Sequence, residues 1–542
     1  MDRTFHIRSP AARIFLLAVL FGGEAFLATL QFDGATPVPS GAWIAALVHS
    51  WGPSVARFAI AFSALFATFA FLRNQSELKA TSAAVAPEPV RWVLLVAHFA
   101  AMGIFSLTSL GVYGNGLTAR DSNLAAAAWI FAALAAIASA ALAFLPWRFW
   151  SAMARATGRL WIYVAAAAAL TSAATGAFRS LWEPASRVTF RMVQLFLGPF
   201  VSDMVIQPEA LRIGTRRFTV IIADQCSGLE GIALLLVFGC MWLVLFRHES
   251  RFPQALVLLP LGVIALFLLN AFRITALILI GNAGAREIAA GGFHSQAGWI
   301  AFNSVAFGSS IVARRWRWVS NVAPAPSATT AAESSNLTAA FLVPFLAILA
   351  AGMISRATSG AFEWLYPLRF FAALIALWIF RQSYKELDWK PTILAPATGL
   401  AVFLLWIAVD RISRVSTPMP AALASASPFL RDVWIGLRIL GAVLTVPIAE
   451  ELAFRGFALR RFVSADFDSV KFRSATWLAV LGSSILFGVM HGQQWMLATL
   501  AGVAYALLIR RTGRMGDAVV AHAVTNALLA AFVLLFGQWQ LW

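Results

Sequence analysis

The chain has 542 residues, of which 60% are hydrophobic and only 12% are charged, and its mean hydropathy is +0.78. Such a balance exceeds that of soluble domains and excludes an ordinary globular protein. The net charge of +17 comes mainly from arginines in short segments between apolar runs, which is typical of cytoplasmic loops and not of a nucleic-acid-binding surface. We therefore predict an all-α polytopic membrane protein. Its expected partner is the lipid bilayer, and no nucleic acid is expected to bind. The oligomeric state stays open.

In chain order, the first part of the sequence contains apolar runs long enough to cross a bilayer. A hydrocarbon core about 30 Å thick needs roughly 20 apolar residues per helix. The long segment 179–228 falls between two such runs on the non-cytoplasmic side, and its short apolar piece 193–200 is expected at the membrane interface. The arginine-rich loops alternate onto one face, which the positive-inside rule makes cytoplasmic. We expect helices near residues 11–31, 53–72, 91–113, 123–145, 159–178, 229–246, 254–280 and 296–313.

A segment rich in Pro, Ser, Thr and Ala interrupts the apolar runs at residues 320–337. This composition is typical of a flexible linker. We predict a first transmembrane domain over residues 1–319 with about eight helices, and a second over residues 338–542 with about seven. The predicted fold is therefore two transmembrane helical bundles joined by a linker.

Three polar residues of the first domain fall on the non-cytoplasmic side. The stretch ADQCSGLEG at residues 223–231 places Cys226 just before the helix expected from residue 229. Along the next helix, Arg273 is reached after roughly 30 Å of rise, about one membrane thickness. His294 precedes the following apolar run. The three side chains are thus expected to meet at one membrane face.

Each of these residues is also compatible with an ordinary structural role. A lone cysteine is usually a small buried hydrophobe, an arginine at a helix end reaches for the interface, and a histidine at a helix start caps it. An arginine inside an apolar segment, however, costs about 2.5–3.5 kcal/mol on the insertion scale and therefore indicates a functional position. A thiol, an imidazole and a guanidinium together supply a nucleophile, a proton carrier and an oxyanion stabiliser, the groups that acyl transfer needs.

At these residues the sequence resembles the exosortase family, over roughly residues 11–318. The matching pieces are CSGLEG, NAFRI and GGFHSQAG. The resemblance implies that Cys226 is the nucleophile, Arg273 the oxyanion stabiliser and His294 the general acid and base. It also implies exported protein substrates with a C-terminal sorting tail of the PEP-CTERM type, cleaved at the periplasmic face of a bacterial inner membrane.

A second group of polar residues interrupts the apolar runs after the linker. Adjacent helical residues point about 100° apart, so Glu450 and Glu451 are expected on different faces, while Glu451 pairs with Arg455. Glu450 then stays free to act as a base. A carboxylate that activates water, an imidazole that assists it, and an amide with a second imidazole for the oxyanion are hydrolytic groups. The remaining members of this set are His491, His522 and Asn526.

Two alternative roles of this second group stay open. The residues form a buried polar network that fastens three helices together, or Glu450, His491 and His522 bind zinc. The sequence lacks an HExxH motif, so the zinc alternative is disfavoured and no cofactor is expected. Simple helix counting places His491 at one end of its helix and His522 near the opposite membrane face, which indicates a site within the bilayer.

EELAFR, FGVMH and HAVTN resemble the three motifs of the CPBP family of CAAX-type intramembrane proteases, over about residues 430–540. The resemblance implies that Glu450 and His491 activate water, that Glu451 and Arg455 shape the site, and that His522 and Asn526 form an oxyanion hole. An exosortase-like half followed by a CPBP-like half resembles the exosortase E/protease fusions, which are associated with VPEID-CTERM sorting signals. Two alternatives without protease activity are a membrane transporter and a scaffold for exopolysaccharide assembly.

Overall fold

The computed structural model describes residues 38–73, 89–113, 118–222, 226, 228–321, 336–413 and 418–542, together with scattered positions between 10 and 24. The predicted helix 11–31 and the predicted linker 320–337 lie largely outside the described residues. The chain divides into two compact units, Met1–Ser180 and Leu181–Trp542. Domain boundaries at residues 319 and 338 stay a prediction.

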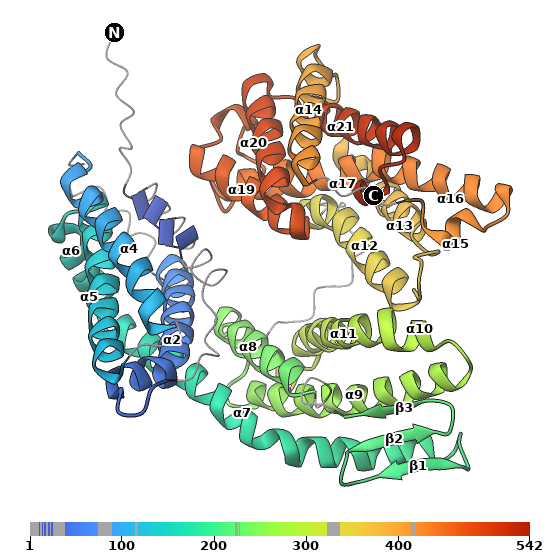
Figure 1. Cartoon of the computed structure of the whole chain (residues 1–542). Helices are drawn as coiled ribbons and strands as arrows, with labels where there is room; N and C mark the ends of the chain where they lie inside the picture. The colour runs from blue at the N-terminus through green and yellow to red at the C-terminus, as the bar shows by residue number, and fades with distance from the viewer. Residues whose placement is uncertain are drawn as a thin grey trace. The chain divides into compact units, whose positions relative to one another are not determined.

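The first unit is a helical bundle in which α4 (Trp92–Val112) and α5 (Ala119–Phe144) form the closest pair (Figure 1). Alanines recur along α5 at positions that are almost fully buried, among them Ala126, Ala136 and Ala140. Small side chains let helix backbones approach closely, which is the usual basis of helix packing in membranes. The other helices of this unit are α2 (Trp43–Arg73), α6 (Trp147–Thr157) and the start of α7 (Leu160–Leu197).

The segment 179–228 differs from its predicted form as a loop outside the membrane. Helix α7 continues through it as far as Leu197, because Phe190, Val193 and Leu197 recur at helical spacing and bury their side chains in one core. The piece 193–200, predicted to lie at the membrane interface, thus includes the end of this helix, where Val193 and Leu197 are buried and Leu195 is exposed.

After α7 the chain forms a small antiparallel sheet, an addition to the predicted all-α fold. Its order is β1-β2-β3, with β1 at Met204–Gln207, β2 at Arg212–Thr215 and β3 at Thr219–Ile221. Ile213 is fully buried against Ile274 and Ile278 of the following helical layer. That layer contains α8 (Leu229–Leu245), η2 (Gln254–Val257), α9 (Leu258–Asn282), α10 (Arg286–Ile288), the π turn η3 (Ala289–Phe293) and α11 (His294–Arg315).

The rest of the chain forms a further set of helices around one long, interrupted rod at Pro428–Arg461. This rod contains α16 (Pro428–Leu440), the π turn η5 (Gly441–Thr445), α17 (Val446–Glu451), the π turn η6 (Leu452–Ala458) and α18 (Leu459–Arg461). The helices that surround it are α12 (Leu337–Ala357), α13 (Leu368–Ile379), α14 (Leu394–Ser413), α19 (Trp477–Val489), α20 (Trp495–Thr512) and α21 (Met515–Phe536). Short elements between them are η4 (Arg381–Tyr384), α15 (Ala421–Ala424), η7 (Phe472–Ser474), η8 (Gly492–Gln494) and η9 (Trp539–Leu541).

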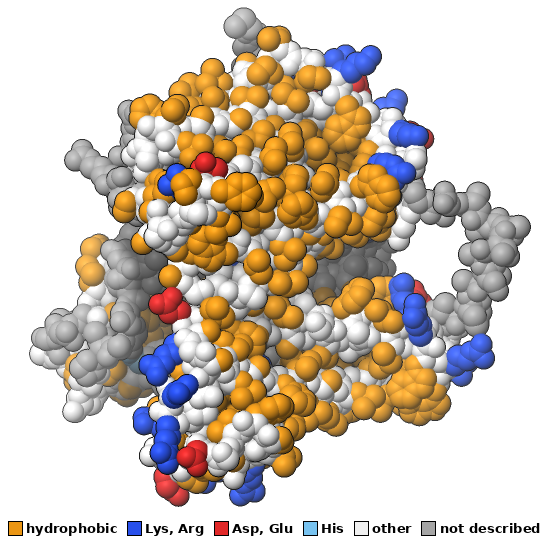
Figure 2. Space-filling view, turned by 90° about the vertical axis from the view of Figure 1, so that its right-hand side faces the viewer, with side chains coloured by type: hydrophobic (Ala, Val, Ile, Leu, Met, Phe, Trp, Pro, Cys, Tyr) orange, Lys and Arg blue, Asp and Glu red, His pale blue; other side chains and the backbone are white. Residues whose placement is uncertain are grey.

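Within the described residues, 7 helices are long and apolar enough to cross a membrane. Figure 2 shows that hydrophobic side chains cover most of one face, whereas lysines and arginines gather toward its edges. Exposed apolar side chains are stable only when lipid replaces water around them. The prediction of an all-α, multi-pass membrane protein is confirmed. The candidate spans are Trp92–Val112, Ala119–Phe144, Gln254–Asn282, Leu337–Ala357, Pro428–Arg461, Gly492–Thr512 and Met515–Phe536.

Candidate functional site

The thiol of Cys226 lies in a tight turn directly before α8. Gly228 has a φ of 83°, in the left-handed region that favours glycine. The side-chain amide of Asn270, on α9, donates a hydrogen bond of 2.9 Å to the backbone carbonyl of Cys226. A Cβ at Gly228 would lie 2.9 Å from the same amide nitrogen. The turn is therefore held against α9 by a contact that only glycine permits.

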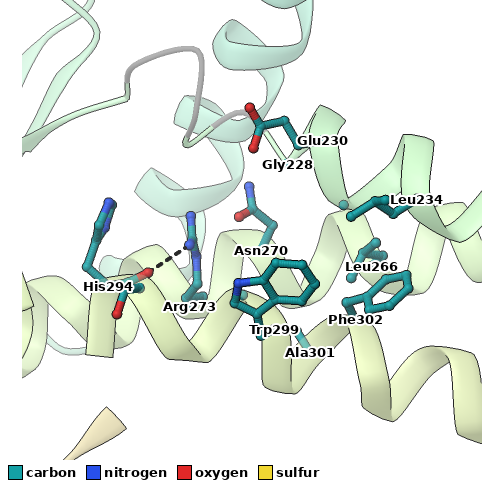
Figure 3. A pocket seen from close by; sticks show the side chains of 13 residues that line it. Gly228, Glu230, Leu234, Leu266, Asn270, Arg273, His294, Trp299, Ala301 and Phe302 are labelled. Atoms are coloured by element: carbon teal, nitrogen blue, oxygen red, sulfur yellow. Dashed lines mark hydrogen bonds between the residues drawn. The ribbon is translucent and has the colours of Figure 1, made fainter. Parts of the chain in front are cut away.

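Arg273 links the thiol turn to the start of α11. Its Nη1 donates to the backbone carbonyl of His294 at 3.2 Å, as the dashed line in Figure 3 shows. Its guanidinium also interacts electrostatically with the Cys226 side chain. Of the three polar residues singled out from the sequence, Arg273 on α9 therefore interacts with the other two.

A cavity of about 230 Å³ opens beside this group. Asn270, Arg273 and His294 gather at one end, and apolar side chains continue from them along α8, α9 and α11 (Figure 3). The His294 ring is half-buried, and burial, followed by the positive charge of Arg273, lowers its pKa. A neutral imidazole can accept a proton from a thiol. The apolar part of the lining consists mainly of Leu234, Leu266, Trp299, Ala301 and Phe302.

A second polar cluster lies on the interrupted rod. Glu451 and Arg455 are both fully buried, and Arg455 Nη1 lies 3.0 Å from Glu451 Oε1. The same carboxylate oxygen lies 2.9 Å from Nδ1 of His522 on α21. Arg455 also donates to the carbonyl of Gly502 on α20 at 2.9 Å. One buried ion pair therefore ties the rod to two neighbouring helices.

Glu450 and Glu451 share one histidine, although the helical spacing predicts that they point to different faces. Nε2 of His522 lies 3.9 Å from Glu450 Oε2, while Nδ1 of the same ring contacts Glu451. The two carboxylates lie at one site because each faces a different nitrogen of the same imidazole ring. Glu450 Oε2 is buried and has no hydrogen-bond partner among the described residues.

The ring of Phe487 lies between His491 and this polar cluster and packs against both histidine rings. The ring of Phe487 lies 4.5 Å from that of His491 and 5.7 Å from that of His522, centroid to centroid. The expectation that the two histidines lie at opposite membrane faces is therefore wrong. Helix counting failed because α19 extends only from Trp477 to Val489 and is too short to cross a bilayer.

The remaining predicted residues make contacts of their own. His491 Nδ1 lies 2.7 Å from the carbonyl of Phe487, and Asn526 donates to the carbonyl of Ala442 at 2.8 Å. Among the described residues, no hydrogen bond or ion pair joins Glu450 to His491. Glu450 and His491, which were expected to activate water together, therefore make no direct contact of these kinds. The imidazole in contact with Glu450 is that of His522.

Two family models match the chain. Residues 51–309 match the transmembrane exosortase model, and residues 432–528 match the type II CAAX prenyl endopeptidase Rce1-like model. The chain joins an exosortase-like segment to a CAAX-protease-like segment. Among curated proteins and solved structures, none matches the chain.

The exosortase-like segment contains Cys226, Arg273 and His294, and the CAAX-protease-like segment contains the whole glutamate cluster. Together they indicate a multi-pass membrane protease or transpeptidase that acts on protein substrates.

Sequence reasoning overlooked two residues that shape these sites. Asn270 belongs to the same NAFRI motif as Arg273, and an amide inside an apolar run is itself a signal of a polar partner. Tyr505, in the CAAX-protease-like segment, stacks on His522 with ring centroids 5.2 Å apart. No sequence signal distinguishes this tyrosine, because only the packing of α20 against α21 brings it to the histidine.

Glu450, His491 and His522, considered as zinc ligands on sequence grounds, do not form a metal-binding group. No cluster of three or more His, Cys, Asp or Glu side chains suited to an ion occurs in the described part of the chain.

Proposed function

We propose that the exosortase-like segment is a cysteine transpeptidase that cleaves C-terminal sorting tails from exported proteins, at the periplasmic face of a bacterial inner membrane. The observation that carries this proposal is that Arg273 interacts with both Cys226 and the backbone of His294, and that Arg273 and His294 line one cavity. These residues come from three separate segments, and a purely structural role does not require a thiol, a guanidinium and an imidazole together.

The proposed reaction proceeds by two acyl transfers. His294 accepts the thiol proton, and the sulfur of Cys226 attacks the scissile carbonyl carbon, so that a C–S bond forms. Arg273 stabilises the oxyanion, and the protonated imidazole passes its proton to the leaving amine as the C–N bond breaks. An amine or a water molecule then attacks the thioester, His294 accepts its proton, and the thiolate leaves.

The cavity fits a substrate that is apolar next to the scissile bond. Its polar end holds the reacting groups, while Leu234, Trp299 and Phe302 line the remainder. A sorting tail whose peptide bond lies beside a transmembrane helix presents such residues. The tail helix would remain in lipid while the bond enters the cavity, which supports cleavage at the membrane surface.

The two cysteines of the chain provide a matched test. Cys226→Ala is expected to abolish shortening of a co-expressed protein that ends in a sorting motif, an apolar helix and arginines. Cys240→Ala, which removes the exposed second thiol, is expected to leave cleavage unchanged. Gel mobility and the mass of the substrate report the outcome. Cleavage that persists in the Cys226 variant refutes the proposed nucleophile.

We further propose that the CAAX-protease-like segment hydrolyses peptide bonds without a covalent intermediate. Its support is Oε2 of Glu450, which makes no hydrogen bond within the described part of the chain and can accept a proton from water. The water oxygen would attack the carbonyl carbon, and His522 and Asn526 would stabilise the oxyanion. The protonated Glu450 would then pass the proton to the leaving amine as the C–N bond breaks. Glu451 and Arg455 hold the His522 ring in position, and His491 would assist the water from beyond Phe487.

This second activity is tested by Glu450→Gln, which preserves shape but removes the base. Release of a fluorescent product from a membrane-anchored peptide should fall about 100-fold or more. Glu386→Gln, at an exposed position, is the control and should retain full activity. Equal activity of the two variants would eliminate Glu450 as the base.

A further inference from the structure

A cluster of arginines and aromatic rings surrounds Tyr366, apart from both candidate sites. The guanidinium carbon of Arg369 lies 4.3 Å from the centroid of the Tyr366 ring, and that of Arg438 lies 4.0 Å from it. Arg438 also faces Trp434 at 5.5 Å and Trp542 at 5.0 Å. These five residues, from α13, α16, the chain terminus and the loop before α13, are called the Tyr366 cluster.

The Tyr366 cluster carries more positive than negative charge. Glu363 accepts a hydrogen bond from Arg369 Nη2, whereas Arg369 Nε is buried without a hydrogen-bond partner among the described residues. Arg438 is partly exposed; its guanidinium packs on the rings and interacts electrostatically with Glu363, and no hydrogen bond of this group is found in the described chain. Two guanidinium groups thus share one carboxylate, and N–H donors remain for an external anion.

The surroundings of the cluster are those of a membrane interface. Leu365, Phe429, Leu430 and Val433 beside it are 48%, 79%, 47% and 41% exposed. The face in Figure 2, on the side where α16 lies in Figure 1, is covered largely by hydrophobic side chains. Tryptophan and tyrosine concentrate where lipid headgroups meet the hydrocarbon core, with arginine reaching toward phosphate.

We propose that the Tyr366 cluster binds the phosphate group of an anionic membrane lipid. A guanidinium offers a planar set of donors that matches phosphate oxygens, and stacking on Tyr366 and Trp434 holds Arg438 in a fixed orientation before the lipid arrives. The exposed apolar side chains of α16 then accommodate the acyl chains.

A role in holding the peptide substrate of the second site fits the structure less well. Arg438 and Glu450 are separated by roughly 18 Å of helix rise along the rod. No described polar contact connects the Tyr366 cluster to the Glu451, Arg455 and His522 group. A lipid, unlike a peptide held by Glu450, needs no such connection.

The test uses the full chain, purified in a zwitterionic detergent, and titrated with phosphatidylglycerol while native mass spectrometry counts bound lipid. Arg438→Gln is expected to weaken binding at least about tenfold, since it removes charge-assisted hydrogen bonds to the phosphate. Arg381→Gln is the matched control, because Arg381 is an exposed arginine stacked on Trp378 at 4.5 Å. Its affinity should equal that of the unaltered chain.

Glu363→Gln provides a change of opposite sign. It removes the carboxylate of Glu363 that pairs with Arg369, so phosphatidylglycerol should bind severalfold more tightly. If Arg438→Gln does not fold, this variant alone tests whether the cluster binds the lipid. Unchanged affinity in Glu363→Gln, or equal losses in the two arginine variants, overturns the proposal. Displacement of lipid by an equal concentration of inorganic phosphate overturns the assignment to lipid. A further outcome is that Arg438→Gln raises KM for peptide cleavage and leaves lipid binding unaltered. That result would assign the Tyr366 cluster to the peptide substrate and would overturn the lipid proposal.

Discussion

At the residue scale, the position of the thiol depends on one amide. Asn270 donates to the carbonyl of Cys226, and its amide also fills the space beside Gly228. The side chain is 7% exposed, so water does not replace this bond readily. Asn270 is therefore a positioning residue for the proposed nucleophile, because it orients the turn and does not itself contact the reacting atoms.

Asn270→Ala should lower kcat for tail cleavage roughly 10- to 100-fold, because a nucleophile displaced by about 1 Å loses that much. KM should change little, since the apolar part of the cavity lining remains. Kinetics of a purified tail peptide in detergent measure both constants. Asn303→Ala, which removes a similar amide-to-carbonyl bond of 2.8 Å at an exposed position, should match the unaltered chain. Loss of substrate affinity alone would contradict the positioning role.

At the element scale, close helix contacts place the second site. A Cβ at Gly399 on α14 would lie 2.4 Å from the carbonyl oxygen of Ala521 on α21. Thr525 of α21 donates to the carbonyl of Gly399 at 3.0 Å and accepts from the hydroxyl of Tyr505 at 2.8 Å. Because Tyr505 stacks on His522, the approach of α14 to α21 fixes the imidazole at the glutamates.

Gly399→Val should push α21 away and lower the free energy of unfolding by about 1–3 kcal/mol, the usual cost of overpacking. Peptide hydrolysis at Glu450 should fall as well, while tail cleavage at Cys226 persists. Thermal denaturation in detergent and the two activity assays report these effects. Gly436→Val serves as the control, because nothing lies within 4 Å of a Cβ there. Equal destabilisation by both variants would indicate a general effect of valine.

At the scale of the whole molecule, the membrane orientation determines which compartment each site meets. Arginine-rich loops place the turn of Cys226 on the non-cytoplasmic side by the positive-inside rule. This orientation stays a prediction, since helices alone do not define the two faces of a membrane. It connects directly to the proposed substrate, because an exported protein reaches only the outer side.

In a Cys240→Ala background, a membrane-impermeant maleimide should label Cys226 in intact cells, since its side chain is only partly buried. Labelling should disappear in Cys226→Ala and should not increase when the membrane is permeabilised. Labelling only after permeabilisation would reverse the orientation and exclude a periplasmic substrate. Mass spectrometry of the intact chain measures the modified fraction.

The sequence predicted much of the architecture and the polar groups of both sites. Continuous apolar runs determine transmembrane helices because a bilayer requires every backbone hydrogen bond to be made within the helix. Residues such as Arg273 and Glu450 were recognisable because charge inside an apolar run is costly. The continuation of α7 to Leu197 and the three-stranded sheet were not predicted, since their stability comes from burial against α9.

By itself, the sequence determined that this is a helical membrane protein, and it predicted a thiol group and a glutamate group as its catalytic residues. Only the tertiary structure decided which side chains meet: Asn270 with the turn of Cys226, and one His522 ring with both glutamates. The physical reason is that hydropathy depends on neighbours along the chain, whereas a site depends on contacts between helices that are distant in sequence. Those contacts follow from packing, which no local pattern records.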